Sequence, residues 1–213
     1  FVMLTGSAIA IPWENENIPA IINAWYGGQS GGTAVADVLF GDYNPAGRLP
    51  VTFYKSDNDL PGFSDYSMKG RTYRYFNGDA LYPFGYGLSY THFKYQVTKI
   101  PSVLTKGKPV TISFTLTNTG KKDGEEVAQL YITHQTSGMK PIRALKGFQR
   151  VFLKAGETKK LMFTLTSDQL SLVNETGALY QPDGKISISV GGGQPGVSNK
   201  TSSNIVTKVI TVQ

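Results

Sequence analysis

The second half of the chain alternates apolar and polar residues with a period of two, and this pattern restricts what it can fold into. In the segment TISFTLTN, Ile112, Phe114 and Leu116 alternate with Thr and Ser. The same alternation recurs in three further segments: 127–133, 160–166 and 185–191. Each run is bounded by residues that form turns. About seven such strands within about 120 residues predict an antiparallel β-sandwich.

The first part of the chain has a different pattern. Residues 2–5 and 20–26 are short, continuously apolar runs, which suit strands covered on both faces of an α/β sheet. Apolar residues between 30 and 41 lie at helical spacing, and Gly41 fits the position just after a helix. The segment 51–54 predicts another short strand. Residues 1 to about 55 therefore predict the last βαβ portion of an α/β layer structure.

Composition excludes several classes of site. The chain has 213 residues, 40% of them hydrophobic, which is enough for one large or two small domains with proper cores. Cysteine is absent, so disulfides, thiol catalysis and zinc–thiolate sites are excluded. With only two histidines, His92 and His134, a histidine-rich metal site is not expected. We expect no metal and no cofactor.

Net charge and the apolar runs indicate which partners the chain can be expected to have. The net charge is +6, but the basic residues are scattered beside turn residues, so nucleic acid is not an expected partner. No apolar run approaches the roughly 18 residues that a membrane helix needs, so a membrane is not expected either. The opening FVMLTGSAIAI is typical of a buried strand and not of a signal peptide. We therefore expect the chain to be a piece of a larger protein.

Two triplets, Asn174-Glu-Thr176 and Asn199-Lys-Thr201, fit the N-glycosylation pattern. The pattern matters only in a eukaryotic secretory chain.

The segment Gly28-Gln-Ser30-Gly-Gly32 matches the G-x-S-x-G pattern of a serine nucleophile between a strand and a helix. A serine nucleophile also needs a histidine base oriented by a carboxylate. His92 and His134 both fall in or beside the predicted sandwich. A tight turn with Ser30 at the N-cap of the helix is the favoured interpretation. A serine hydrolase stays a weaker alternative, which Ser30→Ala would test.

Carboxylates are the other candidates for chemistry, because cleavage of a glycosidic bond needs two of them. Glu14 and Glu16 are predicted in a loop after the first strand, where an α/β sheet binds ligands. Asp37 and Asp42 lie by the end of the predicted helix, as surface or capping residues. The other candidates follow it: Asp57, Asp59, Asp65 and Asp79. Nothing in the sequence singles out a catalytic pair.

The segment 70–93 concentrates aromatic residues and interrupts them with glycines. It joins the two parts of the chain, so its rings either fill the joint between them or line a binding site. The half YPFGYGLSYT suits packing, with glycines allowing sharp turns. The half RTYRYF mixes arginine with tyrosine, which suits sugar hydroxyls and ring faces. Arg71 and Tyr73 are therefore candidate substrate-binding residues, with packing as the alternative.

Three segments resemble successive landmarks of glycoside hydrolase family 3. They are AWYGGQSGGTAVADVLFGDYNPAGRLPVTFYKS (24–56), YSMKGRTYRYFNGDALYPFGYGLSYTHFKY (66–95) and RALKGFQRVFLKAGETKKLMFTL (143–165). They occur in the family's order and cover essentially the whole chain. GRTYRYF is more similar to β-xylosidase-type members than to fungal β-glucosidases. One departure is Gly27-Gly28-Gln29, where members usually have Pro-Gly-Gln.

The resemblance implies an architecture. Family members have a barrel domain, then an α/β sandwich and, in many cases, a fibronectin type III-like domain. This chain would be the C-terminal segment of the α/β sandwich (1–56), a connecting strap (57–90) and an all-β fibronectin type III-like sandwich (91–213). Its partners would be the N-terminal barrel and α/β domains of the same protein and an oligosaccharide substrate, with a homo-oligomer also possible.

The resemblance also implies a mechanism. Members are typically retaining exo-acting enzymes that remove terminal β-linked sugars, here xylose or glucose, with an aspartate nucleophile and a glutamate acid/base. Both segments lie upstream of this chain in the family, so no catalytic residue is assigned and the chain alone is expected to be inactive. The substrate class suggests a periplasmic or secreted protein. The alternative from another class is a non-catalytic carbohydrate-binding or structural module.

Overall fold

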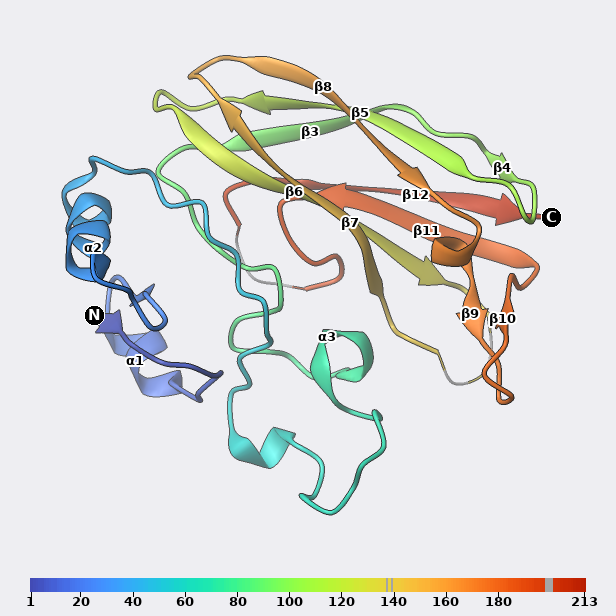
Figure 1. Cartoon of the computed structure of the whole chain (residues 1–213), viewed down its shortest axis with the longest axis horizontal. Coiled ribbons are helices and arrows are strands. Elements are labelled where there is room, and N and C mark those ends of the chain that lie inside the picture. The colour runs from blue at the N-terminus through green and yellow to red at the C-terminus, as the bar shows by residue number, and fades with distance from the viewer. Residues whose placement is uncertain (137, 139, 198–200) are drawn as a thin grey trace.

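The computed structural model divides the chain into short α/β elements followed by a β-sandwich (Figure 1). It describes residues 1–136, 138, 140–197 and 201–213. Asn199 of the second glycosylation triplet lies outside this part of the chain. The first elements, in order, are β1 (Val2–Met3), α1 (Pro12–Asn17), β2 (Ile22–Asn23) and α2 (Gly31–Phe40).

The α/β prediction for the N-terminal part is confirmed in outline. The two apolar runs supply β1 and β2, which pair in parallel with Val2 opposite Ile22. The predicted helix is α2, and Gly41 follows it in the left-handed conformation with φ of 85°. A small core of buried residues holds this part together: Met3, Ile11, Phe53 and Leu81.

Two local predictions in this part are wrong. Glu14 and Glu16 do not lie in a loop but on α1, which begins at Pro12, a residue favoured at a first helical position. The segment 51–54 is not a strand. Phe53 makes a single antiparallel bridge to Tyr82, because its partner is the strap, which turns at Pro83 instead of continuing as a strand.

The strap runs from the α/β elements to the sandwich. It contains the single turn η1 (Asp57–Asp59) and the short helix α3 (Thr72–Tyr75), and the loop between them extends to the lower edge of the molecule (Figure 1). Close ring pairs run along it, for example Tyr82 on Tyr86 with centroids 5.3 Å apart. A Cβ on Gly87 would collide with the carbonyl oxygen of Gly47, so this glycine lets the strap lie against the backbone.

The sandwich consists of two sheets packed face to face, in which every strand pair is antiparallel except the parallel pair of β12 and β4. In the described part of the chain the smaller sheet has the order β3-β5-β8 and the larger one β4-β12-β11-β6-β7. The strands of the smaller sheet are β3 (Phe93–Lys99), β5 (Val110–Asn118) and β8 (Thr158–Leu165). Those of the larger sheet are β4 (Val103–Leu104), β6 (Gly124–His134), β7 (Ala144–Leu153), β11 (Gly184–Gly191) and β12 (Ile205–Val212). The predicted sandwich is confirmed.

The alternation of the sequence predicts the core between the sheets correctly, but it misses a second buried face on β6. Ile112, Phe114 and Leu116 of β5 are buried between the sheets, as expected. On β6, however, Gln129 and Tyr131 of the opposite face are also buried, at 2% and 1% exposure. The strap covers this outer face, and the Gln129 amide donates to the carbonyl of Gly85.

Candidate functional site

The predicted serine nucleophile has no catalytic partner. Ser30 is exposed at the N-cap of α2, as the turn interpretation predicts, although its hydroxyl makes no capping hydrogen bond. His92 is exposed just before β3, and His134 is buried at the end of β6. Among the described residues no hydrogen bond joins Ser30 to either histidine. The residues of a triad are therefore not brought together.

Three of the candidate carboxylates, Asp59, Asp65 and Asp79, have local structural roles. Asp59 and Asp65 each accept a hydrogen bond from a nearby backbone N–H, those of Ser56 and Ser67. Asp79 pairs with Lys55 at 2.6 Å. In the described residues, no group of three or more His, Cys, Asp or Glu side chains is placed to hold a metal ion.

Arg71 organises the loop between η1 and α3. Its Nε donates to the carbonyl of Ser67, and its Nη2 donates to the carbonyls of Gly62 and Asp65. The next residue, Thr72, has φ of 56°, which is unfavourable for a β-branched side chain, and its N–H donates to the Tyr54 hydroxyl. These contacts hold the loop against Arg71 and Tyr54, and backbone strain of this kind is frequent at functional sites.

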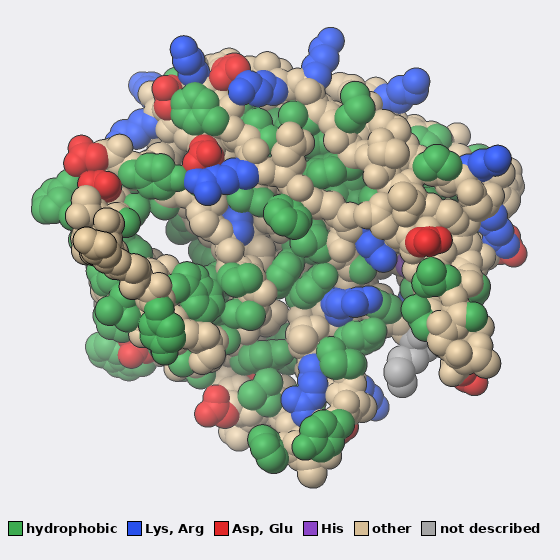
Figure 2. Space-filling model, viewed as in Figure 1, with side chains coloured by type: hydrophobic (Ala, Val, Ile, Leu, Met, Phe, Trp, Pro, Cys, Tyr) green, Lys and Arg blue, Asp and Glu red, His purple; other side chains and the backbone are tan. Residues whose placement is uncertain are grey.

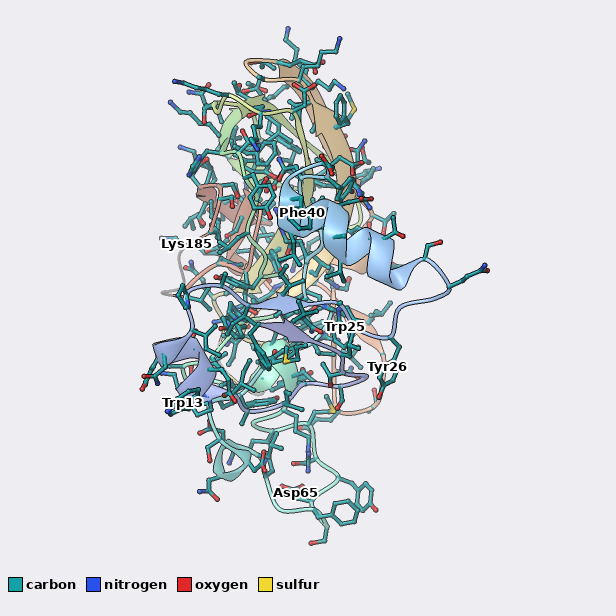
Figure 3. All side chains as sticks on the ribbon, turned by 90° about the vertical axis from the view of Figure 1, so that its left-hand side faces the viewer. Trp13, Trp25, Tyr26, Phe40, Asp65 and Lys185 are labelled. Carbon is teal, nitrogen blue, oxygen red and sulfur yellow. The ribbon has the colours of Figure 1, made fainter. Side chains whose placement is uncertain are left out.

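The loop held by Arg71 presents aromatic side chains to solvent. Phe63 is 97% exposed and Tyr66 is 90% exposed. A shallow groove lies beside them, lined also by Asp57, Leu60, Pro61, Asp65 and Arg71. Asp65 marks this loop at the lower end of the molecule in Figure 3. Exposed rings beside polar groups are the arrangement that contacts sugars, whose faces are apolar and whose edges carry hydroxyls.

Tyr73 points to the sandwich and not to the groove. Its ring stacks on Phe84 with centroids 4.2 Å apart and meets Tyr131 edge-on. Its hydroxyl accepts a hydrogen bond from the N–H of Leu145 at 3.1 Å. The two residues singled out in RTYRYF therefore have their polar groups directed at different segments, the loop for Arg71 and β7 for Tyr73.

A buried ion pair joins the α/β part to the sandwich. Arg48 Nη2 lies 2.5 Å from Glu126 Oε2, and the hydroxyls of Tyr95 and Ser203 donate to Oε1. Burial raises the pKa of the Glu126 carboxyl, and the Arg48 guanidinium and the hydroxyls oppose that rise. Sequence reasoning missed this cluster. The available signal was parity, because Glu126 is in step with the buried Ala128 and Leu130 on β6.

The N-terminal elements expose large apolar side chains, whereas the sandwich exposes charged ones. Trp13 of α1 and Phe40 of α2 are 64% and 84% exposed and project from the N-terminal elements (Figure 3). On the face in Figure 2, lysine and arginine side chains are spread along the sandwich with acidic side chains between them. Within the described residues, no helix has the length and apolar character to cross a membrane.

Comparison with known proteins identifies both parts of this architecture. Residues 1–90 match the glycosyl hydrolase family 3 C-terminal domain, and residues 126–194 match a fibronectin type III-like domain. A xylan 1,4-β-xylosidase of Xylanibacter ruminicola is 50% identical over 192 residues, which are 90% of this chain and 22% of that protein. The periplasmic β-glucosidase of Salmonella typhimurium is 38% identical over 204 residues, covering 89% of this chain and 27% of its own length.

Solved structures agree with these relatives. The β-glucosidase from Kluyveromyces marxianus in complex with glucose superposes with a TM-score of 0.86 and 32% identity, over 100% of this chain and 26% of that one. A β-glucosidase mutant from Listeria innocua in complex with laminaribiose has a TM-score of 0.83 and 26% identity, over 100% of this chain and 30% of that one. The chain thus spans less than a third of the length of these relatives. It belongs to glycoside hydrolase family 3 and carries the family's C-terminal domain followed by a fibronectin type III-like domain.

Proposed function

We propose that the chain is part of a retaining, exo-acting glycoside hydrolase that removes terminal β-linked xylose or glucose from oligosaccharides. The observation that carries this proposal is the 50% identity to a xylan 1,4-β-xylosidase over 90% of this chain. Xylose is therefore the first candidate sugar. Glucose is the second, because the periplasmic relative and the superposed structures are β-glucosidases.

The proposal assigns the reacting carboxylates to segments outside this chain. A retaining mechanism needs two carboxyl groups about 5 Å apart, one as nucleophile and one as acid/base. Within the chain, Asp59, Asp65 and Asp79 have local partners. The share of each relative that the chain covers, 22% to 30%, leaves room for a catalytic domain. The 23.2 kDa chain alone is then inactive.

The exposed apolar side chains of α1 and α2 support docking to the remainder of that enzyme. Neither helix buries any of its residues, whereas a helix of an α/β layer normally buries one face. Trp13 of α1 and Phe40 of α2 are the large apolar side chains that these helices expose. The barrel and the rest of the α/β sandwich are the proposed partners. In this arrangement 1–56 complete the α/β sandwich, 57–90 form the strap, and 91–213 support both.

The loop of Phe63 and Tyr66 is the proposed point of contact with oligosaccharide. Its support is the exposure of both rings and the three carbonyls that Arg71 binds to hold them. Arg71 contributes through this loop. Direct substrate contact by Tyr73 stays a prediction beside its packing role, and kinetics and stability separate the two.

A carbohydrate-binding module without activity is the second candidate, since exposed rings also serve binding alone. The test pairs an intact mass with release of nitrophenol from β-xyloside and β-glucoside. Turnover by a species several times larger than 23.2 kDa supports the glycosidase and ranks its sugars. Binding of xylo-oligosaccharide without turnover by that species favours the module. Turnover by the 23.2 kDa chain alone overturns the placement of the carboxylates.

A periplasmic or secreted location is part of the proposal. It rests on the oligosaccharide substrate and on one relative whose name is periplasmic β-glucosidase. Cell fractionation followed by detection of the protein checks it. Recovery with the cytoplasmic fraction would contradict it.

A further inference from the structure

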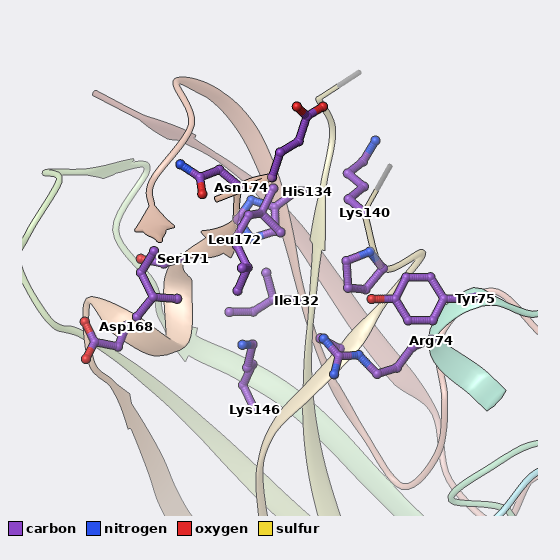
Figure 4. A pocket seen from close by; sticks show the side chains of 15 residues that line it. Arg74, Tyr75, Ile132, His134, Lys140, Lys146, Asp168, Ser171, Leu172 and Asn174 are labelled. Carbon is purple, nitrogen blue, oxygen red and sulfur yellow. The ribbon is translucent and has the colours of Figure 1, made fainter. Parts of the chain in front are cut away.

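A pocket of about 380 Å³ opens in the sandwich, away from the loop of Phe63 and Tyr66 (Figure 4). It lies between the ends of β6 and β7, helix α3, and the hairpin of β9 (Leu172–Val173) and β10 (Leu179–Tyr180). Cationic side chains reach it from different segments: Arg74 from α3, Lys140 from the β6–β7 connection and Lys146 from β7.

The contacts that the cations of this pocket make are not ion pairs. In the part of the chain that the structure describes, no ion pair involves Arg74, Lys140 or Lys146. The Lys140 ammonium donates to the Thr136 carbonyl, and the Arg74 guanidinium lies 5.8 Å from the centroid of the Tyr75 ring. Burial, and then the charge of Arg74, lowers the pKa of Lys146. Like charges are thus held near one another in a partly dry site.

His134 supplies an independent sign of a missing ligand. It is 6% exposed, it lines the pocket, and neither of its ring nitrogens has a hydrogen-bond partner among the described residues. Burial, followed by the charges of Lys146 and Lys140, lowers its pKa to about 4, so the ring is neutral at pH 7. A neutral imidazole carries one N–H donor, and buried donors are normally satisfied.

The backbone directs Lys146 into the pocket. Leu145 pairs with Tyr131 and Gly147 with Leu130, so Lys146 is the extra residue of a β-bulge on β7. Bulges turn a side chain away from the regular alternation and are frequent beside functional sites. The carbonyl of Lys146 accepts a hydrogen bond from the Gln169 amide, which fixes the bulge. In Figure 4 the Lys146 ammonium points toward Ile132 and the interior of the pocket.

Two carboxylates, Asp168 and Glu175, also line the pocket, and they offset its charge only in part. Asp168 lies at the far edge in Figure 4, with its carboxylate directed away from Arg74 and Lys146. The titratable side chains around the pocket are Arg74, Tyr75, His134, Lys140, Lys146, Asp168 and Glu175. With His134 neutral, three cations face two carboxylates, which leaves an excess of one positive charge.

We propose that this pocket binds an oxyanion, either free or carried by a sugar-sized ligand, with Arg74 and Lys146 pairing its charge and His134 donating its ring N–H. The volume is that of a small-ligand site, and Ile132 and Leu172 give it apolar walls for the body of the ligand. A carboxylate and a phosphate share this chemistry, because both accept charge-assisted hydrogen bonds from arginine and lysine. A hexuronate and free phosphate are the two possible sources. Binding in this pocket does not require glycosidase activity.

The test follows His134 by nitrogen-15 NMR of the imidazole. Since the chain has only two histidines, His92→Gln leaves a single imidazole signal, and His92 is exposed. The purified protein is titrated with D-glucuronate, with inorganic phosphate and with D-glucose as the neutral match of glucuronate. We expect saturable shifts of the His134 signals with an anion and none with glucose. Arg74→Gln and Lys146→Gln each weaken binding about tenfold. Lys154→Gln, an exposed cation beyond β7, leaves it unchanged.

The outcomes separate the sources and can refute the site. A response to glucuronate that exceeds the response to phosphate supports a sugar acid, and the reverse supports free phosphate. No saturable shift with either anion overturns the proposal, as does an equal shift with glucose. Lys146→Arg keeps the charge and is expected to keep binding, so it replaces Lys146→Gln if that variant fails to unfold cooperatively in urea. Undiminished binding by both Arg74→Gln and Lys146→Gln also overturns the proposal.

Discussion

Arg48 and Glu126 form an ion pair of 2.5 Å whose side chains are 6% and 0% exposed. They lie far apart in sequence, in the turn after α2 and on β6, and the hydroxyls of Tyr95 and Ser203 complete the hydrogen bonding of the carboxylate. Among the described residues the buried Nε of Arg48 has no hydrogen-bond partner, so the pair is satisfied only in part, and its net contribution to stability is small because both charges lose their hydration. The pair is one of the contacts that tie the α/β part to the sandwich.

Removing one member of this pair is expected to be costly. Glu126→Gln or Arg48→Met leaves a buried charge unpaired and should lower the free energy of unfolding by about 3–5 kcal/mol. The double variant Arg48→Met/Glu126→Leu should lose less than the sum of the single variants. Urea unfolding measures all of them.

The adjacent residue provides the control for that experiment. Glu125 pairs with Arg150 at the surface, with side chains 28% and 54% exposed. Because solvent screens this pair, Glu125→Gln should change the free energy of unfolding by less than about 1 kcal/mol. Equal losses for Glu125→Gln and Glu126→Gln would contradict the role given to the buried pair.

Tyr73→Phe is expected to destabilise the joint between strap and sandwich. The change leaves the Leu145 N–H without its acceptor and should cost about 1–3 kcal/mol in urea unfolding. Tyr66→Phe, on a side chain that is 90% exposed, should stay within about 0.5 kcal/mol of the parent. In the active enzyme, an unchanged KM for Tyr73→Phe and Tyr73→Ala supports packing, and a raised KM with unchanged stability supports substrate contact.

Phe63→Ala is expected to weaken oligosaccharide binding without destabilising the protein. Loss of one stacking ring should raise KM by up to about tenfold, with the free energy of unfolding unchanged. Arg71→Ala should have a similar effect because it releases the carbonyls of Gly62 and Asp65. Phe148→Ala, on a side chain of β7 that is 70% exposed, is the matched control. A KM unaffected by both Phe63→Ala and Arg71→Ala would exclude the loop from substrate binding.

Because His134 is buried as a neutral ring, we expect the protein to lose stability on mild acidification. Its folded-state pKa of about 4 is below the ordinary value of 6.5, so the unfolded chain binds the proton more readily. Stability from this group is complete above pH 6.5 and declines by up to about 3 kcal/mol as the pH falls toward 4. His134→Gln should flatten the pH dependence of urea unfolding in this window, whereas His92→Gln should not. Identical slopes for the parent and His134→Gln would contradict the burial of a neutral ring.

The sandwich could be predicted because its signal is local. Alternation of Ile112, Phe114 and Leu116 encodes a strand with one buried face, and the turn residues encode its ends. The parallel strands and α2 were predictable for the same reason. The helix α1 was not, because six residues without an apolar period give no helical signal beyond the proline at their start. The segment 51–54 was mispredicted because an apolar run does not specify whether a partner strand exists.

The candidate sites were less predictable than the fold. Arg71 and Tyr73 were recognisable as a mixture of side chains, but adjacency in sequence did not reveal that one holds a loop and the other packs on β6 and β7. The pocket of Arg74, Lys140 and Lys146 gave no sequence signal. Its residues come from separate segments, and a bulge at Lys146 breaks the alternation that would have placed its side chain.

The sequence by itself determined the family, the order of its two parts and the inner face of each sandwich strand, because these depend on local periodicity and on long matching segments. Only the tertiary structure decided what covers the outer face of β6, where Gln129 and Tyr131 are buried under the strap. It also decided that Glu126 meets Arg48. Both outcomes depend on contacts between residues distant in sequence, which periodicity does not encode. They also depend on burial, because a polar or charged group costs free energy only once it is removed from water.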